Sequence, residues 1–251
     1  MTIGEMVAKK AELIELKKAA IKYTDTSQGS VIKTGSIGKA DNKFKDTEDT
    51  VYRTIIGNTY NWMDSHDDVH VKGCFSKSIK ERADKVFHLH DHEYKLTSRV
   101  GEPQEILEKD ISWKTLGVDM EGETTSLLML SKIKKSYNEI IFNDYKEMKI
   151  DQHSVGMRYI KVELAVNNEE YEDEYKNWSQ YYGSIANKER ADEVGYFWIV
   201  KEAALIEISA VLMGSNPITG TLQPEKSIVE SKEEVADALH KSIKEYYKNL
   251  I

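Results

Sequence analysis

Cysteine is almost absent from this sequence, and long apolar runs are missing. The single cysteine, Cys74, excludes an internal disulfide and fits a reducing compartment. No apolar run approaches the ~18 residues that a membrane-spanning helix needs, and the first residues lack the apolar core of a signal peptide. We therefore expect a cytoplasmic protein without membrane contact.

Basic residues are fewer than acidic residues in this sequence. The chain has 35 Lys and Arg against 43 Asp and Glu, a net charge of -8. Nucleic-acid binding needs clustered Lys and Arg, so this balance argues against nucleic acid as the main partner and leaves a basic protein partner open. The 251 residues, of which 40% are hydrophobic and 31% charged, predict one large globular domain with appendages.

Three segments differ in pattern. Residues 1–29 carry apolar residues at three- and four-residue spacing and end in a polar break, which predicts an N-terminal helical appendage docked on the domain. Residues 30–222 contain the strand-like patterns and form the expected main domain. Residues 223–251 are charged and helical in pattern, which predicts a linker and a C-terminal helical tail.

Periodicity places the expected elements of the main domain. Helical spacing predicts helices at residues 76–83, with Ser76 as the N-cap, and at residues 134–149. Residues 167–190 are acidic and tyrosine-rich, and we interpret them as an inserted helix or lid whose aromatic side chains serve packing. Alternating or apolar patterns predict strands at residues 30–38, 51–59, 86–92, 104–108, 111–120, 124–130, 154–163 and 195–213.

One acidic stretch invites a metal interpretation. It contains Asp64, His66, Asp67, Asp68 and His70. The spacing of these residues matches neither an EF-hand loop nor a zinc-binding template. We therefore predict no metal there.

A second stretch, residues 86–92, holds three histidines. As a strand it places His88, His90 and His92 on one face. Such a face suits either zinc ligation or a general base that activates a serine. The residues alone leave both interpretations open.

Ser154 is the candidate nucleophile, beside a glycine that permits close approach of a substrate. A serine acts in this way only with a base and an orienting group nearby. Glu207 lies in the most apolar stretch of the chain, where a carboxylate must be paired and rigidly held, as the orienting member of a triad is. Asp91 and His153 compete with Glu207 for that role.

Together these stretches resemble the prohead maturation proteases of tailed phages, which are similar to the herpesvirus assemblins. The resemblance covers about residues 30–222 and rests on the order of four motifs. The chain departs from the family in having Gly214-Ser215 where Pro-Ala is usual. The motifs are an acidic turn leading to Gly-x-Phe at residues 64–75, His90-Asp91 followed by Arg99-x-Gly101, Ser154-x-Gly156, and Glu207-x-Ser209 followed by Asn216-Pro217.

This resemblance implies an α+β fold with a mostly antiparallel β-barrel core flanked by helices, as in the assemblins. It also implies a serine endopeptidase in which Ser154 attacks the scissile carbonyl, His90 accepts its proton and Glu207 orients the histidine. Neither a metal nor another cofactor is implied.

The implied substrates are the phage scaffold and major capsid proteins and the enzyme's own chain, within the assembling prohead in the host cytoplasm. A homo-oligomer is left open. Two rival functions remain. One is a metal-dependent hydrolase that uses His88, His90 and His92, and the other is a catalytically silent capsid-assembly protein.

Overall fold

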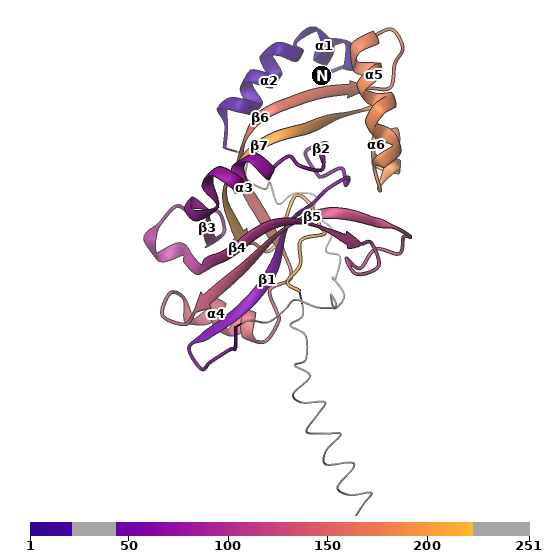
Figure 1. Cartoon of the computed structure of the whole chain (residues 1–251). Helices are drawn as coiled ribbons and strands as arrows, with labels where there is room; N and C mark the ends of the chain where they lie inside the picture. Colours follow the sequence, from indigo (N-terminus) through magenta and orange to yellow (C-terminus); the bar gives the residue numbers. More distant parts are fainter. Residues whose placement is uncertain (22–43, 223–251) are drawn as a thin grey trace, which may run out of the picture.

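Two long antiparallel strands, β6 (His153–Val166) and β7 (Tyr196–Ala210), run through the molecule and connect its two ends (Figure 1). The computed structural model describes residues 1–21 and 44–222. Strand β7 is buried along most of its length, because its sequence is apolar on both faces, and β6 buries most of its residues except exposed positions such as Arg158 and Ile160. Such two-sided burial suits a central strand.

The described strands form one mixed sheet in the order β1-β5-β4-β3-β7-β2, with β6 also paired to β7. Strands β2 and β3 run parallel to β7, whereas the other pairs are antiparallel. Strand β7 therefore has three partners and is the hub of the sheet. The remaining strands are β1 (Thr50–Thr59), β2 (Asp68–His70), β3 (Phe87–His90), β4 (Arg99–Ser112) and β5 (Glu123–Lys134).

The sheet does not close into a barrel. Residues 214–222 lie between β1 and β6: the Ile56 N–H donates to Gly220 O at 2.9 Å, and the Leu222 N–H donates to Thr54 O at 2.8 Å. The ring of His153, on β6, bonds Thr219 O at 2.7 Å. The predicted α+β class is confirmed, but the predicted barrel is wrong, because this segment occupies the edge that β6 would have to fill.

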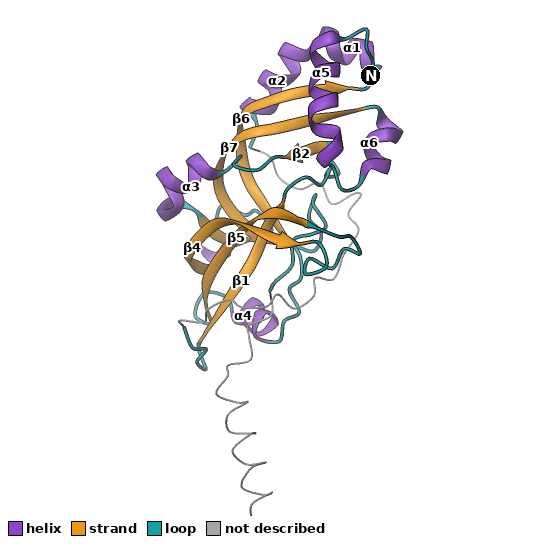
Figure 2. Ribbon diagram, turned by 45° about the vertical axis from the view of Figure 1, so that its right-hand side comes forward, coloured by secondary structure: helices purple, strands orange, loops and turns teal. Residues whose placement is uncertain are grey.

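Helices cover the two ends of the sheet. Four of them, α1, α2, α5 and α6, gather around one end of β6 and β7, whereas α4 packs on β1 and β5 at the other end (Figure 2). Their bounds are α1 (Ile3–Ala8), α2 (Lys10–Ala19), α3 (Ser76–Arg82), α4 (Glu139–Lys146), α5 (Glu172–Tyr181) and α6 (Lys188–Val194), with 3-10 turns at Ala83–Lys85, Leu96–Ser98 and Tyr182–Ser184.

Most of the predicted elements are confirmed, and the errors lie at boundaries. The predicted strand at residues 111–120 is wrong, since β4 continues through Ser112 and a turn with Gly122 at φ +89° follows. The predicted helix at residues 134–149 begins only after Asn138, whose side chain accepts the Ile141 N–H. Phe75, not Ser76, is the N-cap of α3.

The insert is helical, as predicted, and its aromatic side chains pack. The Trp178 ring lies 5.2 Å from that of Phe197 and 4.8 Å from that of Tyr182. The N-terminal helices dock on the domain, with Met6 in its core. The strand predicted at residues 30–38 and the C-terminal tail at residues 223–251 lie outside the described residues.

Candidate active site

The pairing of β6 with β7 places Ser154 and Glu207 on one face of the sheet. Ser154 is the direct partner of Ser209, and Gly156 is the partner of Glu207. Directly opposed residues share a face, with Cβ atoms roughly 5 Å apart. We call this side of the sheet the serine face.

His92 reaches the serine face through a tight turn. Strand β3 ends at His90, and the Glu93 N–H bonds back to His90 O at 3.1 Å. The two residues between them have positive φ, 50° at Asp91 and 54° at His92. Positive φ is uncommon without glycine, and two such residues in succession are typical of a type I′ turn. This reversal brings the His92 ring over β7.

Three hydrogen bonds link His92, Glu207 and Ser209, and one of them involves the His92 ring. His92 Nδ1 lies 2.6 Å from Glu207 Oε1, the Ser209 hydroxyl donates to Glu207 Oε2 at 2.6 Å, and the His92 N–H donates to Ser209 Oγ at 3.2 Å. Glu207 is fully buried and the His92 side chain is 9% exposed. A carboxylate on Nδ1 fixes the tautomer of the imidazole and leaves Nε2 as its basic atom.

Gly156 makes room for the carboxylate. A Cβ at this position would lie 1.9 Å from Glu207 Oε1. Any side chain there would displace the carboxylate from its position beside His92. The absence of a side chain at Gly156 thus leaves room for the Glu207 carboxylate beside His92.

His90, which the sequence predicted as the base, lies on the opposite face. The parallel register pairs His90 with Ala210, one residue beyond Ser209, and His90 Nδ1 lies 3.3 Å from Asp91 Oδ2. The prediction that the three histidines share one face is wrong, because the strand ends at His90 and the turn carries His92 over the sheet. The structure brings His92, not His90, to Glu207.

The other two candidates for the orienting role also have different partners. Asp91 contacts His90. His153 precedes Ser154 on β6, so its side chain points to the face opposite the serine face. Among these three predicted candidates, Glu207 is the one whose carboxylate is bonded to His92.

His153 belongs to a fully buried chain of hydrogen bonds behind the serine face. Its Nε2 bonds the Tyr145 hydroxyl at 2.8 Å, which bonds His88 Nε2 at 3.0 Å, and His88 Nδ1 bonds Ser131 Oγ at 2.7 Å. At the other end His153 Nδ1 lies 2.7 Å from Thr219 O. We call this the His-Tyr-His chain.

The direction of every bond in the His-Tyr-His chain follows from its last acceptor. A carbonyl only accepts, so His153 Nδ1 carries a proton, and in the neutral imidazole Nε2 then accepts from Tyr145. The Tyr145 oxygen then accepts from His88 Nε2, and His88 Nδ1 accepts from Ser131. This arrangement satisfies all five groups with both imidazoles neutral.

Burial keeps both imidazoles neutral. Desolvation, together with the nearby His153, lowers the pKa of His88 to about 3. Desolvation also lowers the pKa of His153 to about 4, against a smaller opposing effect of the Thr219 carbonyl. Burial raises the pKa of Tyr145 well above its ordinary value. The His-Tyr-His chain is therefore an uncharged structural element at neutral pH.

The zinc alternative finds no support in these positions. His88 lies in the interior, His90 beside Asp91 and His92 on Glu207, so the three rings do not converge. No group of three or more His, Cys, Asp or Glu side chains within residues 1–21 and 44–222 could hold a metal ion.

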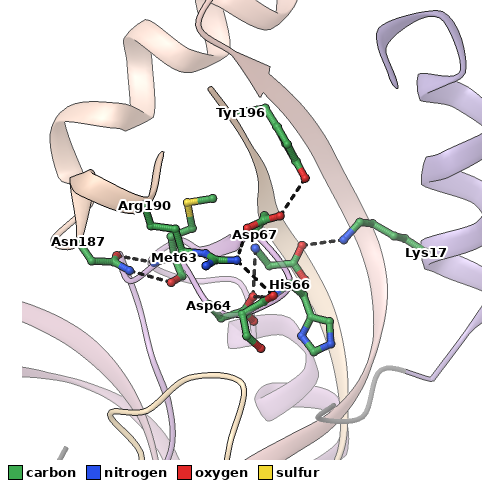
Figure 3. Close-up of polar contacts among 10 residues, drawn as sticks. Lys17, Met63, Asp64, His66, Asp67, Asn187, Arg190 and Tyr196 are labelled. Carbon is green, nitrogen blue, oxygen red and sulfur yellow. Dashed lines mark hydrogen bonds and ion pairs between the residues drawn. The ribbon is translucent and has the colours of Figure 1, made fainter. Parts of the chain in front are cut away.

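The acidic turn at residues 64–68 connects elements instead. Asp67 accepts from Arg190 at 2.6 Å and from Tyr196 at 2.8 Å, and Asp68 accepts from Lys17 at 2.7 Å (Figure 3). The turn thereby ties the N-terminal helix, the insert and β7 together.

An apolar pocket lies on the serine face beside these groups. Leu89 is the partner of both Ser209 and Arg99, so one row of residues crosses four strands from Ser154 to Arg99. The pocket has a volume of about 190 Å³ and is lined by Phe87, Leu89, Tyr94, Lys95, Leu96 and Arg99.

No family model matches this chain, and neither do any curated protein or solved structure. None of the described helices is long and apolar enough to cross a membrane.

Proposed function

We propose that the protein is a serine endopeptidase whose catalytic residues are Ser154, His92 and Glu207. The observation that carries this proposal is the 2.6 Å contact between His92 Nδ1 and Glu207 Oε1 on the face that bears Ser154. A nucleophile, a base and a buried acid that orients the base are the three parts that serine hydrolysis needs.

Each residue has a definite role in this mechanism. Ser154 Oγ attacks the scissile carbonyl, and His92 Nε2 accepts its proton and later returns it to the leaving amine. Glu207 stabilises the imidazolium that forms between these steps. Ser209 holds the second carboxylate oxygen and the His92 backbone, so both members of the pair are fixed before substrate binds.

Substrate binding requires a local opening. Ser154 is 5% exposed, which leaves almost no open space at its side chain. A peptide carbonyl does not fit there until a neighbouring segment moves. Such gating is common among enzymes that exclude water from the reaction.

Scaffold and capsid proteins of a phage, within the assembling prohead in the host cytoplasm, are the substrates that we propose. The order of the four sequence motifs supports this choice. The apolar pocket on the serine face adds a place for a substrate side chain.

A serine-directed phosphonate probe tests the mechanism without knowledge of the substrate. We expect a fluorophosphonate to modify Ser154 of the full chain, because His92 activates its hydroxyl. Peptide mapping by mass spectrometry locates the adduct. Ser131 and Ser209 serve as internal controls, since both are buried and hydrogen-bonded.

The matched variants are His92→Ala and His90→Ala. Labelling at Ser154 should disappear in the first and persist in the second. A chain that the probe leaves unmodified, and that cleaves no co-expressed capsid or scaffold protein, would instead support a catalytically silent assembly protein.

We also predict that the enzyme cuts its own chain near residues 24–30 and 222–231. Both stretches combine turn residues with polarity, and nicking concentrates in such segments. Intact-mass measurement on the active chain should show shorter species that end within these stretches. The Ser154→Ala chain should keep its full mass, and equal trimming in both proteins would contradict the prediction.

A further inference from the structure

The N-terminal helices present one stripe of side chains to the domain. Its members recur at alternating spacings of three and four residues, which places them on one helical face. Three of its five members are apolar, and the other two are lysines seven residues apart. The stripe consists of Ile3, Met6, Lys10, Leu13 and Lys17.

The lysines of this stripe bind two buried carboxylates. Lys17 Nζ lies 2.7 Å from Asp68, whose side chain is fully buried, and Lys10 pairs with Glu174 of α5. Figure 3 shows Lys17 extending from its helix toward the acidic turn. Each lysine therefore forms an ion pair with one carboxylate of the domain.

Aromatic side chains line the surface between these carboxylates. Lys17 Nζ lies 5.3 Å from the centre of the Tyr159 ring and 5.1 Å from that of Trp198, both within cation–π range. The Tyr159 hydroxyl also donates to Asp68. We call the surface formed by Asp68, Tyr159, Glu174, Tyr196 and Trp198 the helix groove.

The protein's own helices fill the helix groove poorly. A pocket of about 420 Å³ remains between the N-terminal segment and Tyr159, Tyr196 and Trp198. None of the ten residues of α2, all of them described, is buried, and Met6 is the one buried residue of α1. Ile3, Val7, Leu13 and Ile14 pack against the core but stay only partly buried, so little apolar area is fully buried and the two ion pairs add to this attachment.

Twenty-two residues, 22–43, separate the N-terminal helices from the rest of the described chain. Residues 22–43 can span roughly 70 Å when extended, at ~3.3 Å per residue. The N-terminal helices can therefore leave the helix groove while β1 stays in the sheet. A tether of this kind also keeps them at a high effective concentration, so a competitor must bind more tightly than they do.

We propose that the helix groove is a receptor for an amphipathic helix of a partner protein, and that α1 and α2 are its exchangeable occupant. The partner helix carries two lysines seven residues apart, with an apolar residue three positions after the first lysine and apolar residues four and seven positions before it. Complementary charge sets its orientation, because Asp68 and Glu174 each take one lysine. This inference goes beyond proteolysis and does not depend on Ser154.

Binding of a synthetic peptide of residues 1–21 tests the exchange. The measurement is fluorescence anisotropy of the labelled peptide, with all proteins carrying Ser154→Ala so that no trimming occurs. We expect the chain with Met6→Glu and Lys17→Glu, whose own helices are released, to bind the peptide at least tenfold more tightly than the chain with the native stripe. Adding Asp68→Asn to the released chain should remove that gain, and so should a peptide with Lys10→Glu and Lys17→Glu.

Equal binding by the released and native chains would overturn the proposal. A concentration-dependent dimer of the native chain, abolished by Lys17→Glu, would also overturn it by assigning the groove to a second copy. Hydrogen exchange on the native chain provides a test that needs no stripe variant. Raising the salt from 0.1 to 0.5 M should speed exchange in α1 and α2 and leave β6 and β7 unchanged, because salt screens the ion pairs. Salt-independent exchange in the two helices would contradict an exchangeable occupant.

Discussion

Replacing His92 with alanine is expected to lower the rate of peptide cleavage by a factor of about 10⁴ or more. Glu207 bonds the His92 ring, and in the mechanism that we propose the variant loses the base that activates Ser154. His90→Ala is expected to retain activity within about threefold of the native enzyme, because its ring lies on the other face of the sheet beside Asp91. The measurement is cleavage of one capsid or scaffold substrate by purified variants.

Two checks make this contrast decisive. Circular dichroism and thermal unfolding establish that both variants are folded. Glu207→Gln should lie between them, with a smaller loss than His92→Ala, because an amide keeps the shape of the acid but cannot stabilise the imidazolium. If His90→Ala were the inactive variant, the proton acceptor would have to act from the opposite face and the proposed site would be wrong.

Acid is expected to destabilise the fold steeply below pH 6.5. Both His88 and His153 are neutral in the folded protein, with pKa values lowered to about 3 and about 4, whereas in the unfolded chain they take up protons near the ordinary value of 6.5. Between pH 6.5 and 4 the unfolded state thus binds more protons than the folded state. The free energy of unfolding should fall by about 1.4 kcal/mol for each pH unit and each histidine.

Denaturant unfolding at several pH values between 7.5 and 4.5 measures this slope. Above pH 6.5 the stabilisation is fully present, and it is lost progressively as the pH falls toward the lowered pKa values. His88→Gln should remove about half of the histidine contribution to the slope, whereas His90→Gln, whose ring lies outside the His-Tyr-His chain, should preserve it. An unchanged slope in His88→Gln would show that the His-Tyr-His chain tolerates protonation.

Local pattern predicted the strands that carry the site better than it predicted how they close. The alternation after Ser154 and the apolar stretch around Glu207 both correspond to strands, β6 and β7. Closure of the sheet depends instead on which distant segment fills the edge beside β1. Residues 214–222 fill this edge, and their sequence has no strand-like alternation that would predict a pairing with Thr54 and Ile56.

The candidate site shows the same division. The sequence made Ser154 and Glu207 candidates, through the order of four motifs and through the unusual position of a carboxylate among apolar residues. The choice between His90 and His92 depended on where β3 ends, and the turn that ends it uses two residues with positive φ, neither of them glycine. Ser209 was named in the Glu207-x-Ser209 motif but given no role, although its position two residues after Glu207 puts both side chains on one face of a strand.

Synthesis on the ribosome proceeds from the N-terminus, and the hub of the sheet is among the last parts of the described chain to emerge. Strand β7 pairs with β2, β3 and β6, so these three cannot be joined before residues 196–210 have left the exit tunnel. Sheets assembled from such distant segments form late and slowly. Glu207 lies on β7 itself, and the growing polypeptide therefore carries Ser154 and His92 apart from each other until translation is almost complete. The catalytic groups that we propose therefore come together only after β7 has been synthesised.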